Sequence, residues 1–340
     1  MKTDELESVA RSLVAAGKGI LAADESAPTI EKRFRAIRVE STEENRRAYR
    51  ELLFTTAGIA DFISGVILFD ETLRQKSREG TPFPELLGRQ GVIPGIKVDS
   101  GAKALAGFPG EKVTEGLDGL RGRLEEYSGM GARFAKWRAV IGIGAGIPTD
   151  GCLKANAHAL ARYAALCQEA GLVPIVEPEV LMDGPHTIAR CEEVTTRMLS
   201  FVYSELHEHR VFLEGTLLKP NMVLAGKECP HQAPVAEIAK ATVRCLRRSV
   251  PPAVPGIVFL SGGQTPEEST ERLSAMNAMG KSPWELSFSY GRALQEPVLA
   301  AWRGIPGNVP AAQKAFYHRT RCNGAARYGK YSRQMESEAA

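Results

Sequence analysis

The chain of 340 residues and 36.8 kDa contains 44% hydrophobic and 24% charged residues, a composition typical of a globular protein with a large core. Its 43 basic residues nearly balance its 40 acidic ones, so the net charge of +3 does not indicate a nucleic acid or a membrane surface as partner. The charged N-terminus lacks the apolar core of a signal peptide, and no apolar run reaches the roughly 20 residues that span a bilayer. We therefore expect a cytoplasmic protein that binds neither nucleic acid nor membrane.

Short apolar runs typical of β-strands alternate along the chain with longer amphipathic segments typical of helices. The eight strand-like runs are Gly19 to Asp24, Phe62 to Phe69, Ile93 to Asp99, Phe134 to Ile143, Val173 to Val180, Leu217 to Val223, Gly256 to Gly263 and Leu286 to Gly291. The helix-like segments include Thr42 to Thr56, Gly116 to Met130, Leu153 to Ala170, Pro185 to Glu208, Pro234 to Val250 and Pro266 to Met279. From about Asn308 a further helix is expected, ending in a flexible polar tail from Ser332 to Ala340.

Two of the predicted helices carry recognisable start signals. Ser41 is a candidate N-cap because Glu44 follows three residues later, as in a capping box. Thr265 precedes Pro266, and proline is favoured at the first helical position.

Eight alternations without a break in composition predict an α/β fold of the (β/α)₈ or TIM-barrel type, with an extra N-terminal helix. We expect one domain over residues 1–340, with its core at about 19–307 and a C-terminal helix and tail at about 308–340. A doubly wound open sheet is disfavoured, because no G-x-G-x-x-G turn follows the first predicted strand. The glycines from Gly142 to Gly146 lack that spacing and are interpreted as a loop.

Lys219 lies inside the apolar run from Leu217 to Val223, which is an unusual place for a lysine. Burial disfavours the charged ammonium, so a fraction of free amine would be available to attack a carbonyl. Lys219 is therefore the candidate nucleophile. The ordinary alternative is a lysine that extends from the end of a strand into solvent.

Other charged residues stand at the predicted carboxyl ends of strands, where barrel active sites are built. They are Asp24, Lys97, Lys136, Arg138, Glu177 and Glu179. Each has an ordinary explanation: Asp24 as a helix cap, Lys136 and Arg138 as an exposed strand face, the glutamates as neutralising partners of lysines. So many charges at the strand ends are hard to explain by structure alone, and together they favour a charged pocket.

Glycine-rich turns follow the last two predicted strands, at Ser261-Gly262-Gly263 and at Gly291-Arg292. Glycine lets backbone N–H groups approach an anion closely, and barrels often bind phosphate after strands seven and eight. Lys97 and Ser26 lie elsewhere around the ring, so the pattern also indicates a second anionic group at the far end of the substrate.

The chain resembles the class I fructose-1,6-bisphosphate aldolases, which are metal-independent and form a Schiff base. The resemblance covers about residues 19–331 in order and is highly specific. The matching stretches are Gly19 to Ser26, Thr42 to Arg47, Gly65 to Phe69, Gly95 to Asp99, Phe134 to Arg138, Pro174 to Glu179, Leu217 to Met222, Phe259 to Gln264 and Ser287 to Gln295.

The resemblance implies reversible cleavage of fructose 1,6-bisphosphate in glycolysis and gluconeogenesis, with no cofactor and no metal. Lys219 would form the iminium, and Glu177 would act as acid and base for carbinolamine dehydration. Asp24 would take the C4 hydroxyl proton with help from Lys136, while Glu179 supports the lysines.

The same resemblance implies phosphorylated sugars as substrates and a homotetramer as the assembly. One phosphate would meet Ser261, Gly262, Gly263, Gly291 and Arg292 with Arg33 nearby, and Ser26, Thr29 and Lys97 would address the other. Ser289, Arg138 and Arg46 complete the expected substrate contacts.

The chain departs from the family pattern at two places. Pro28 follows Ser26 in what is expected to be a loop, which puts the second phosphate contact in doubt. Studied members end in a tail whose last residue, a tyrosine, aids proton exchange at the enamine, whereas the last tyrosine here is Tyr331. We therefore expect slow exchange of the carbon-bound proton of dihydroxyacetone phosphate.

Three other functions are left open by the residues. A metal-dependent aldolase would need clustered histidines, but the six in this chain are scattered and the six cysteines show neither a C-x-x-C pair nor a metal-like spacing to histidine. A transaldolase-like Schiff-base lyase would accept unphosphorylated donors. A scaffold that binds sugar phosphates without turnover would not need the set of Lys219, Glu177 and Asp24.

Overall fold

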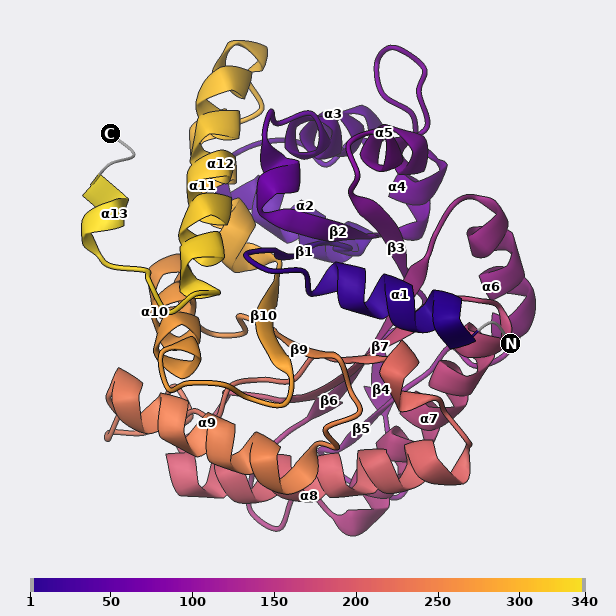
Figure 1. Cartoon of the computed structure of the whole chain (residues 1–340), viewed down its shortest axis with the longest axis vertical. Helices are drawn as coiled ribbons and strands as arrows, with labels where there is room; N and C mark the ends of the chain where they lie inside the picture. The colour runs from indigo at the N-terminus through magenta and orange to yellow at the C-terminus, as the bar shows by residue number, and fades with distance from the viewer. Residues whose placement is uncertain (1–2, 338–340) are drawn as a thin grey trace.

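The computed structural model describes residues 3–337, and its centre is a closed barrel of eight parallel strands surrounded by helices (Figure 1). The barrel strands are β1 (Gly19–Ala23), β2 (Ile63–Leu68), β3 (Ile93–Lys97), β6 (Phe134–Ile141), β7 (Val173–Val180), β8 (Leu217–Leu218), β9 (Gly256–Phe259) and β10 (Glu285–Tyr290). They follow one another around the ring in chain order, and β10 pairs with β1 to close it. The predicted (β/α)₈ barrel is confirmed.

Helices connect the strands and form the outer layer (Figure 1). The α-helices are α1 (Thr3–Leu13), α2 (Ala27–Ala36), α3 (Glu43–Phe54), α4 (Asp70–Arg74), α5 (Phe83–Arg89), α6 (Leu120–Gly129), α7 (Asp150–Glu169), α8 (Ile188–Glu208), α9 (Val235–Ser249), α10 (Pro266–Asn277), α11 (Arg292–Trp302), α12 (Val309–Ala326) and α13 (Gln334–Ser337). Short 3₁₀ turns lie at Ile59–Asp61, Leu213–Gly215 and Pro306–Asn308.

The two predicted helix starts have different outcomes. Helix α10 begins as expected, with a capping box in which Thr265 and Glu268 bond to each other's backbone N–H. Helix α3 begins one residue later than predicted, because Thr42 and not Ser41 is its N-cap. The Thr42 hydroxyl accepts a hydrogen bond from the backbone N–H of Asn45 at 3.1 Å.

Helix α1 closes the amino end of the barrel. Figure 1 shows it crossing the ring of strands, and its apolar face packs against the first inward-facing residues of those strands. This floor cluster consists of Leu6, Ala10, Leu13, Val14, Ile20, Ala22, Ile67, Phe134, Val173, Ile175, Leu217 and Val258. A Cβ atom on Gly65 would lie 2.6 Å from Leu13, and one on Gly256 2.5 Å from Val14, so glycine at both positions lets α1 approach this closely.

A two-stranded antiparallel hairpin, β4 (Ala102–Ala104) and β5 (Lys112–Thr114), lies between β3 and α6 and was not predicted. Its strands have three residues each and are mostly exposed or half-buried, so they lack the apolar alternation that identifies a strand in sequence. The hairpin matters for the site because Gly101 and Ala102 line the central cavity.

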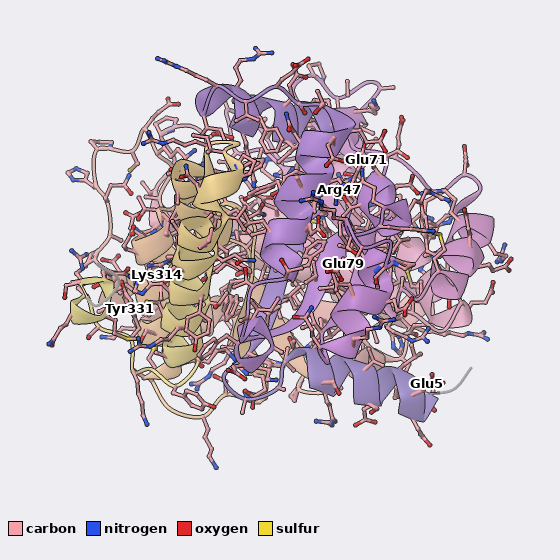
Figure 2. The ribbon with its side chains drawn as sticks, turned by 90° about the horizontal axis from the view of Figure 1, so that it is seen from above. Glu5, Arg47, Glu71, Glu79, Lys314 and Tyr331 are labelled. Carbon is pink, nitrogen blue, oxygen red and sulfur yellow. The ribbon has the colours of Figure 1, made fainter. Side chains whose placement is uncertain are left out.

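The C-terminal segment returns to the body of the protein beside α12 and α10 (Figures 1 and 2). The side chain of Glu336 on α13 accepts hydrogen bonds from Arg319 on α12 and from Tyr331, which Figure 2 labels. The tail predicted to be flexible from Ser332 onward therefore contains a short bonded helix, and its last three residues lie outside the described part of the chain. None of the helices in the described residues is long and apolar enough to cross a membrane.

Candidate active site

One cavity of about 830 Å³ opens at the carboxyl ends of the barrel strands. All site residues predicted from the sequence line it except Arg46. The lining residues among them are Asp24, Ser26, Thr29, Arg33, Lys97, Lys136, Arg138, Glu177, Glu179, Lys219, Ser261, Gly262, Gly263, Ser289, Gly291 and Arg292. The barrel topology thus brings together groups that are as far as 268 positions apart in sequence, from Asp24 to Arg292.

Lys219 follows β8 directly, and its backbone N–H donates to the carbonyl of Val176 on β7 at 2.8 Å. The strand is shorter than predicted, because Pro220 has no N–H with which to continue the ladder. The side chain of Lys219 is only 5% exposed, and its Nζ lies 3.2 Å from Oε1 of Glu177. The candidate nucleophile is therefore buried with a single carboxylate as its ion-pair partner among the described contacts.

Lys136 on β6 lies on the other side of Glu177. Its Nζ is 3.2 Å from Oε2 of Glu177 and 2.7 Å from Oδ2 of Asp24, and all three side chains are almost completely inaccessible. Glu177 thus bridges the amines of Lys136 and Lys219, and a continuous chain of charges runs from Asp24 to Lys219.

These contacts keep Asp24 and Lys136 ionised. Burial by itself would raise the pKa of Asp24, but Lys136 and Lys219 outweigh it and hold the pKa well below the ordinary value. Burial would lower the pKa of Lys136, yet Asp24 and Glu177 raise it well above the ordinary value. At neutral pH the site therefore contains a fixed carboxylate and a fixed ammonium beside the amine of Lys219.

Glu179 lies two residues after Glu177 on β7, so both side chains are on the same face and Glu179 is nearer the cavity mouth. It accepts a hydrogen bond from Nε of Arg138 on β6, so the two opposite charges pair at the rim of the cavity. Burial opposes the charge on Arg138, but Glu179 and Glu177 raise the pKa of the guanidinium above its ordinary range.

Asp99 is a site residue that sequence reasoning did not single out. Its Oδ1 accepts from Nζ of Lys97 at 2.7 Å and from the N–H of Gly101 at 3.1 Å, while Oδ2 accepts from the N–H of Arg138 at 3.2 Å. Asp99 therefore fixes the ammonium of Lys97 at the cavity wall. Its position two residues after Lys97, on the same strand face, was the available signal.

Glu25 is a second missed residue, and it organises the side of the cavity beneath α2. Its carboxylate pairs with Arg33 and with Arg50, and it accepts from the side-chain amide of Gln295 at 2.7 Å. Burial opposes ionisation, but the two arginines hold the pKa of Glu25 below its ordinary value. Glu25 thus places the guanidinium of Arg33 at the cavity edge.

The glycines after β9 leave room for the charged groups around them. A Cβ atom on Gly262 would lie 2.9 Å from Oε1 of Glu179. Gly263 has a φ of +76°, and a Cβ there would meet Lys227 and Met182 at 2.8 Å. Only glycine fits this turn without displacing a neighbour, so its backbone faces the cavity directly.

The turn after β10 provides the adjacent part of the wall. Ser289 is buried, and its hydroxyl has no hydrogen-bond partner within the described residues. A Cβ on Gly291 would come within 3.2 Å of the carbonyl of Ala22 and 3.8 Å of Arg33 Nη2, so the turn packs closely against β1 and the guanidinium of Arg33. Arg292 is exposed at the rim and donates to the carbonyl of Gln264 at 3.3 Å.

The segment after Asp24 differs from the prediction. Ala27 and Pro28 form the first turn of α2 with Ser26 as N-cap, and are not a loop. Proline is favoured in this first turn, so Pro28 does not disturb the site. At the N-terminus of α2 the hydroxyls of Ser26 and Thr29 lie 3.1 Å apart and line the cavity, and the positive end of the helix dipole also favours an anion there.

Arg46 does not reach the cavity, so its predicted substrate contact is not supported. Its guanidinium makes two hydrogen bonds to Glu71, at 2.7 and 2.6 Å, and a third to the carbonyl of Ser41 at 2.5 Å. Glu71 lies at the start of α4, near Arg47 of α3 (Figure 2). The role of Arg46 is to join α3 to α4.

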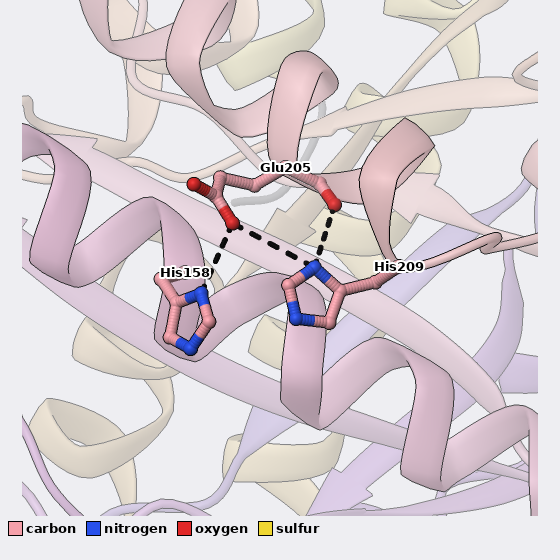
Figure 3. Close-up of side chains that lie close together, drawn as sticks. All are labelled: His158, Glu205 and His209. Carbon is pink, nitrogen blue, oxygen red and sulfur yellow. Dashed lines mark hydrogen bonds and ion pairs between the residues drawn. The ribbon is translucent and has the colours of Figure 1, made fainter.

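The histidines are not as scattered as the sequence suggested. His158 on α7 and His209 at the end of α8 both face Glu205, with ring centroids 4.9 Å apart (Figure 3). Neither of the two grouped histidines lines the central cavity, so the group plays no part in the candidate active site.

The arrangement of charges is suited to acid and base chemistry at a lysine. A buried amine stands beside a carboxylate that can exchange protons with it, and that carboxylate is in turn held by a fixed ammonium. Around this chain, backbone N–H groups and basic side chains face the cavity from two sides, which suits a substrate with an anionic group at each end.

Comparisons with known proteins agree with this geometry. The family model described as glycolytic fructose-bisphosphate aldolase class-I matches residues 5–340. The chain is 59% identical over 332 residues to the probable fructose-bisphosphate aldolase class 1 of Xanthomonas campestris, covering 97% of this chain and 99% of that protein. It is 56% identical over 338 residues to the cytosolic fructose-bisphosphate aldolase 5 of Arabidopsis thaliana, covering 99% and 94%.

A solved structure is similar to this chain in both sequence and fold. The fructose-bisphosphate aldolase of Plasmodium falciparum superimposes with a TM-score of 0.96 at 54% identity, covering 97% of this chain and 96% of that one. Similarity in fold and sequence thus extends over nearly the whole of both chains.

Proposed function

Because the chain belongs to the class I fructose-bisphosphate aldolase family, we propose that its central cavity cleaves fructose 1,6-bisphosphate through a Schiff base on Lys219. The chain is a carbon–carbon lyase, and the products are dihydroxyacetone phosphate and glyceraldehyde 3-phosphate. The reaction is reversible and belongs to glycolysis.

The first half of the reaction builds the iminium. The free amine of Lys219 attacks the keto carbon of the open-chain sugar and forms a carbinolamine. Glu177, within 3.2 Å of the amine, gives a proton to the departing hydroxyl, so water leaves and the protonated imine remains. Lys136 stabilises the Glu177 carboxylate that this step regenerates.

The second half breaks the bond between C3 and C4. Asp24 takes the proton of the C4 hydroxyl, the aldehyde leaves, and the electron pair of the broken bond passes into the iminium to give an enamine. Since Lys136 and Lys219 hold the pKa of Asp24 well below its ordinary value, its carboxylate is ionised at neutral pH. Protonation of the enamine and hydrolysis of the imine then release dihydroxyacetone phosphate and free Lys219.

The two phosphates are assigned to the two basic sides of the cavity. One meets the glycine turns at Gly262 and Gly291 with Arg292 and Arg33, where backbone N–H groups can donate. The other meets Lys97 and the N-terminus of α2 at Ser26 and Thr29. Holding both ends fixes C2 beside Lys219 and C4 beside Asp24.

The observation that carries the proposal is the continuous chain of ion pairs from Asp24 through Lys136 and Glu177 to Lys219. Its test is a cleavage assay with fructose 1,6-bisphosphate in the presence of a chelator. We expect full activity with chelator and loss of activity in Lys219→Met. Lys227→Met, which changes an exposed lysine at the cavity edge, is the matched control and should keep most of the activity.

Loss of activity on chelation, or equal loss in both lysine variants, would contradict the proposal. Activity on unphosphorylated donors comparable with that on the bisphosphate would instead favour a transaldolase-like lyase.

Assembly, compartment and domain organisation are parts of the same proposal that rest on family membership. We propose a homotetramer in the cytosol whose 340 residues form one domain. A relative from Arabidopsis thaliana named as cytosolic supports the compartment. Sedimentation equilibrium tests the assembly, and a mass of one or two chains would contradict it.

A further inference from the structure

A cluster of metal-ligand side chains lies near the C-terminal end of the described residues, where α12 meets α13. Its members are His318, Cys322 and Glu336, and one ligand atom of each lies within 4.8 Å of the others. None of them lines the catalytic cavity. The expectation that no cysteine has a metal-like spacing to histidine was wrong for His318 and Cys322, which are four residues apart in one helix. The third member, Glu336, could not be assigned from the sequence because the turn between the helices separates it from the other two.

The local structure explains why the side chains converge. His318 and Cys322 are four residues apart on α12, so they lie on one face of that helix. Tyr331 and α13 then bring Glu336 back over this face. Nε2 of His318 lies 3.0 Å from Oε2 of Glu336 and 3.5 Å from Sγ of Cys322.

These distances match a tetrahedral zinc ion. Zinc binds nitrogen and oxygen at about 2.0 to 2.2 Å and sulfur at about 2.3 Å, so neighbouring ligand atoms in a tetrahedron stand roughly 3.3 to 3.6 Å apart. The His318–Cys322 separation already fits, and the His318–Glu336 separation needs to widen by only a few tenths of an ångström. The ligand set of histidine, thiolate and carboxylate is one that zinc accepts.

The carboxylate of Glu336 has one oxygen available for such an ion. Oε1 accepts hydrogen bonds from Arg319 at 2.5 Å and Tyr331 at 2.6 Å, whereas Oε2 faces His318.

Arg319 is a cation bonded to Oε1 of Glu336, and the second nitrogen of its guanidinium is bonded outside the cluster. Its Nη2 donates to the carbonyl of Pro266 at 3.0 Å and to the hydroxyl of Thr270 at 2.6 Å. A bound Zn²⁺ would face two anionic ligands, Glu336 and the Cys322 thiolate, which offset the repulsion from Arg319.

The solvent exposure of the ligands and the protons that they would lose are also compatible with metal binding. Cys322 is buried, while the side chains of His318 and Glu336 are 13% and 24% exposed, so an ion with one bound water can enter from the solvent side. Binding releases the thiol proton of Cys322 to solvent, and neutral His318 carries its remaining proton on Nδ1 so that Nε2 can coordinate.

We propose that His318, Cys322 and Glu336 form a zinc site that joins the C-terminal segment to α12. The bound ion would replace one His318–Glu336 hydrogen bond by three coordinate bonds and would fix α13 on the barrel. The site is independent of the lysine chemistry, and its loss should leave the cleavage reaction intact.

The surface group of His158, Glu205 and His209 is a weaker candidate for the same ion and serves as an internal control (Figure 3). Nδ1 of His209 is already bonded to the carbonyl of Glu205 at 2.9 Å, and the group contains no thiol. His158 is also half exposed.

The test uses the full chain after removal of metals, with Co²⁺ as a spectroscopic probe and Zn²⁺ as competitor. A thiolate bound to Co²⁺ gives a charge-transfer band in the near ultraviolet, which nitrogen and oxygen ligands do not give. We expect the band in the wild type, its disappearance in Cys322→Ser, and its displacement by Zn²⁺. Cys229→Ser, another buried thiol, and His158→Gln are the controls and should keep it.

Glu336→Gln tests the site without changing the buried thiol. We expect Zn²⁺ affinity to fall at least about tenfold in this variant, since even losses outside the first coordination shell reduce metal affinity about 10–100-fold. Zn²⁺ should raise the Tm of the wild type and of His158→Gln but not that of Glu336→Gln. Absence of the band in the wild type, or its persistence in Cys322→Ser, would overturn the proposal.

Discussion

The two ends of the barrel are built from the same strand faces but have opposite character. Along the inward face of β6, Phe134 lies in the floor cluster, Lys136 in the catalytic chain and Arg138 at the rim. On β8, Leu217 belongs to the floor and Lys219 is the candidate nucleophile two residues later. Alternate residues of each strand face the barrel interior, and they are apolar packing residues at the amino end and charged site residues at the carboxyl end.

The difference shows how buried charges are tolerated in this fold. The floor is apolar and sealed by α1, and its cohesion depends on shape. At the mouth, Asp24, Glu177 and Lys136 lie within ion-pair distance of opposite charges, so the cost of their burial is offset locally. Stability should respond to changes at the floor, and catalysis to changes at the mouth.

The largest contrast is expected on β8. Lys219→Met should reduce turnover at least a thousandfold, because removal of a covalent nucleophile abolishes the reaction path. Its unfolding free energy should change little, since Glu177 keeps Lys136 as partner. Leu217→Ala should do the reverse, lowering the unfolding free energy by about 2–5 kcal/mol with turnover per folded molecule unchanged. Paired denaturation and turnover measurements test this, and similar losses of both properties in both variants would remove the contrast.

Lys136 is where the two roles should overlap. Lys136→Met leaves Asp24 without its nearest cation, so we expect a loss of about 3–5 kcal/mol in unfolding free energy as well as a fall in turnover. The double variant Lys136→Met/Asp24→Asn should regain part of the stability and none of the activity. If the double variant loses as much unfolding free energy as Lys136→Met and Asp24→Asn lose together, the two side chains do not interact.

Substitutions of two glycines, one near the floor and one at the mouth, should show the same contrast between stability and catalysis with smaller effects. A Cβ on Gly95 of β3 would lie 2.3 Å from the ring of Phe134, so Gly95→Ala should lower the unfolding free energy by about 1–3 kcal/mol. Gly262→Ala meets the carboxylate of Glu179, which can move, so it should raise KM for the bisphosphate and affect stability less. Urea unfolding and steady-state kinetics on both variants test this, and a larger loss of stability in Gly262→Ala would contradict it.

The smallest effect concerns Glu336, which belongs to neither end of the barrel. Folding lowers its pKa from 4.5 to about 2, so its contribution to stability is present above pH 4.5 and is lost as the pH falls toward 2. Wild type should therefore lose more unfolding free energy than Glu336→Gln across this window in metal-free buffer. Parallel pH profiles for the two proteins would show that the carboxylate contributes nothing.

The sequence predicted best what depends on local pattern. The strand from Val173 to Val180 was predicted with its true bounds, because its eight residues are flanked by clear turn and helix signals. The predicted strand at Leu217 to Val223 shortened to two residues, because Pro220 interrupts the ladder. The hairpin at Ala102–Ala104 and Lys112–Thr114 was missed because it is short and polar.

Site residues were predictable where they stand at the carboxyl ends of predicted strands. They were harder to predict where their role is to hold another charged side chain by an ion pair. Lys219 and Lys136 were found because charges in apolar runs are conspicuous. Asp99 and Glu25 were missed because their importance lies in the cations they hold, which only the tertiary contacts reveal. Arg46 was assigned to the substrate, but its partner is Glu71 on another helix.

The identity of the reacting amine is tested most directly by trapping it. The wild-type enzyme would be treated with dihydroxyacetone phosphate and borohydride, digested, and its peptides mapped by mass. A Schiff base on Lys219 predicts a reduced adduct on the peptide that contains this residue and no adduct in Lys219→Met. An adduct on Lys136, Lys97 or Lys227 in its place, or no adduct in an active enzyme, would contradict the assignment.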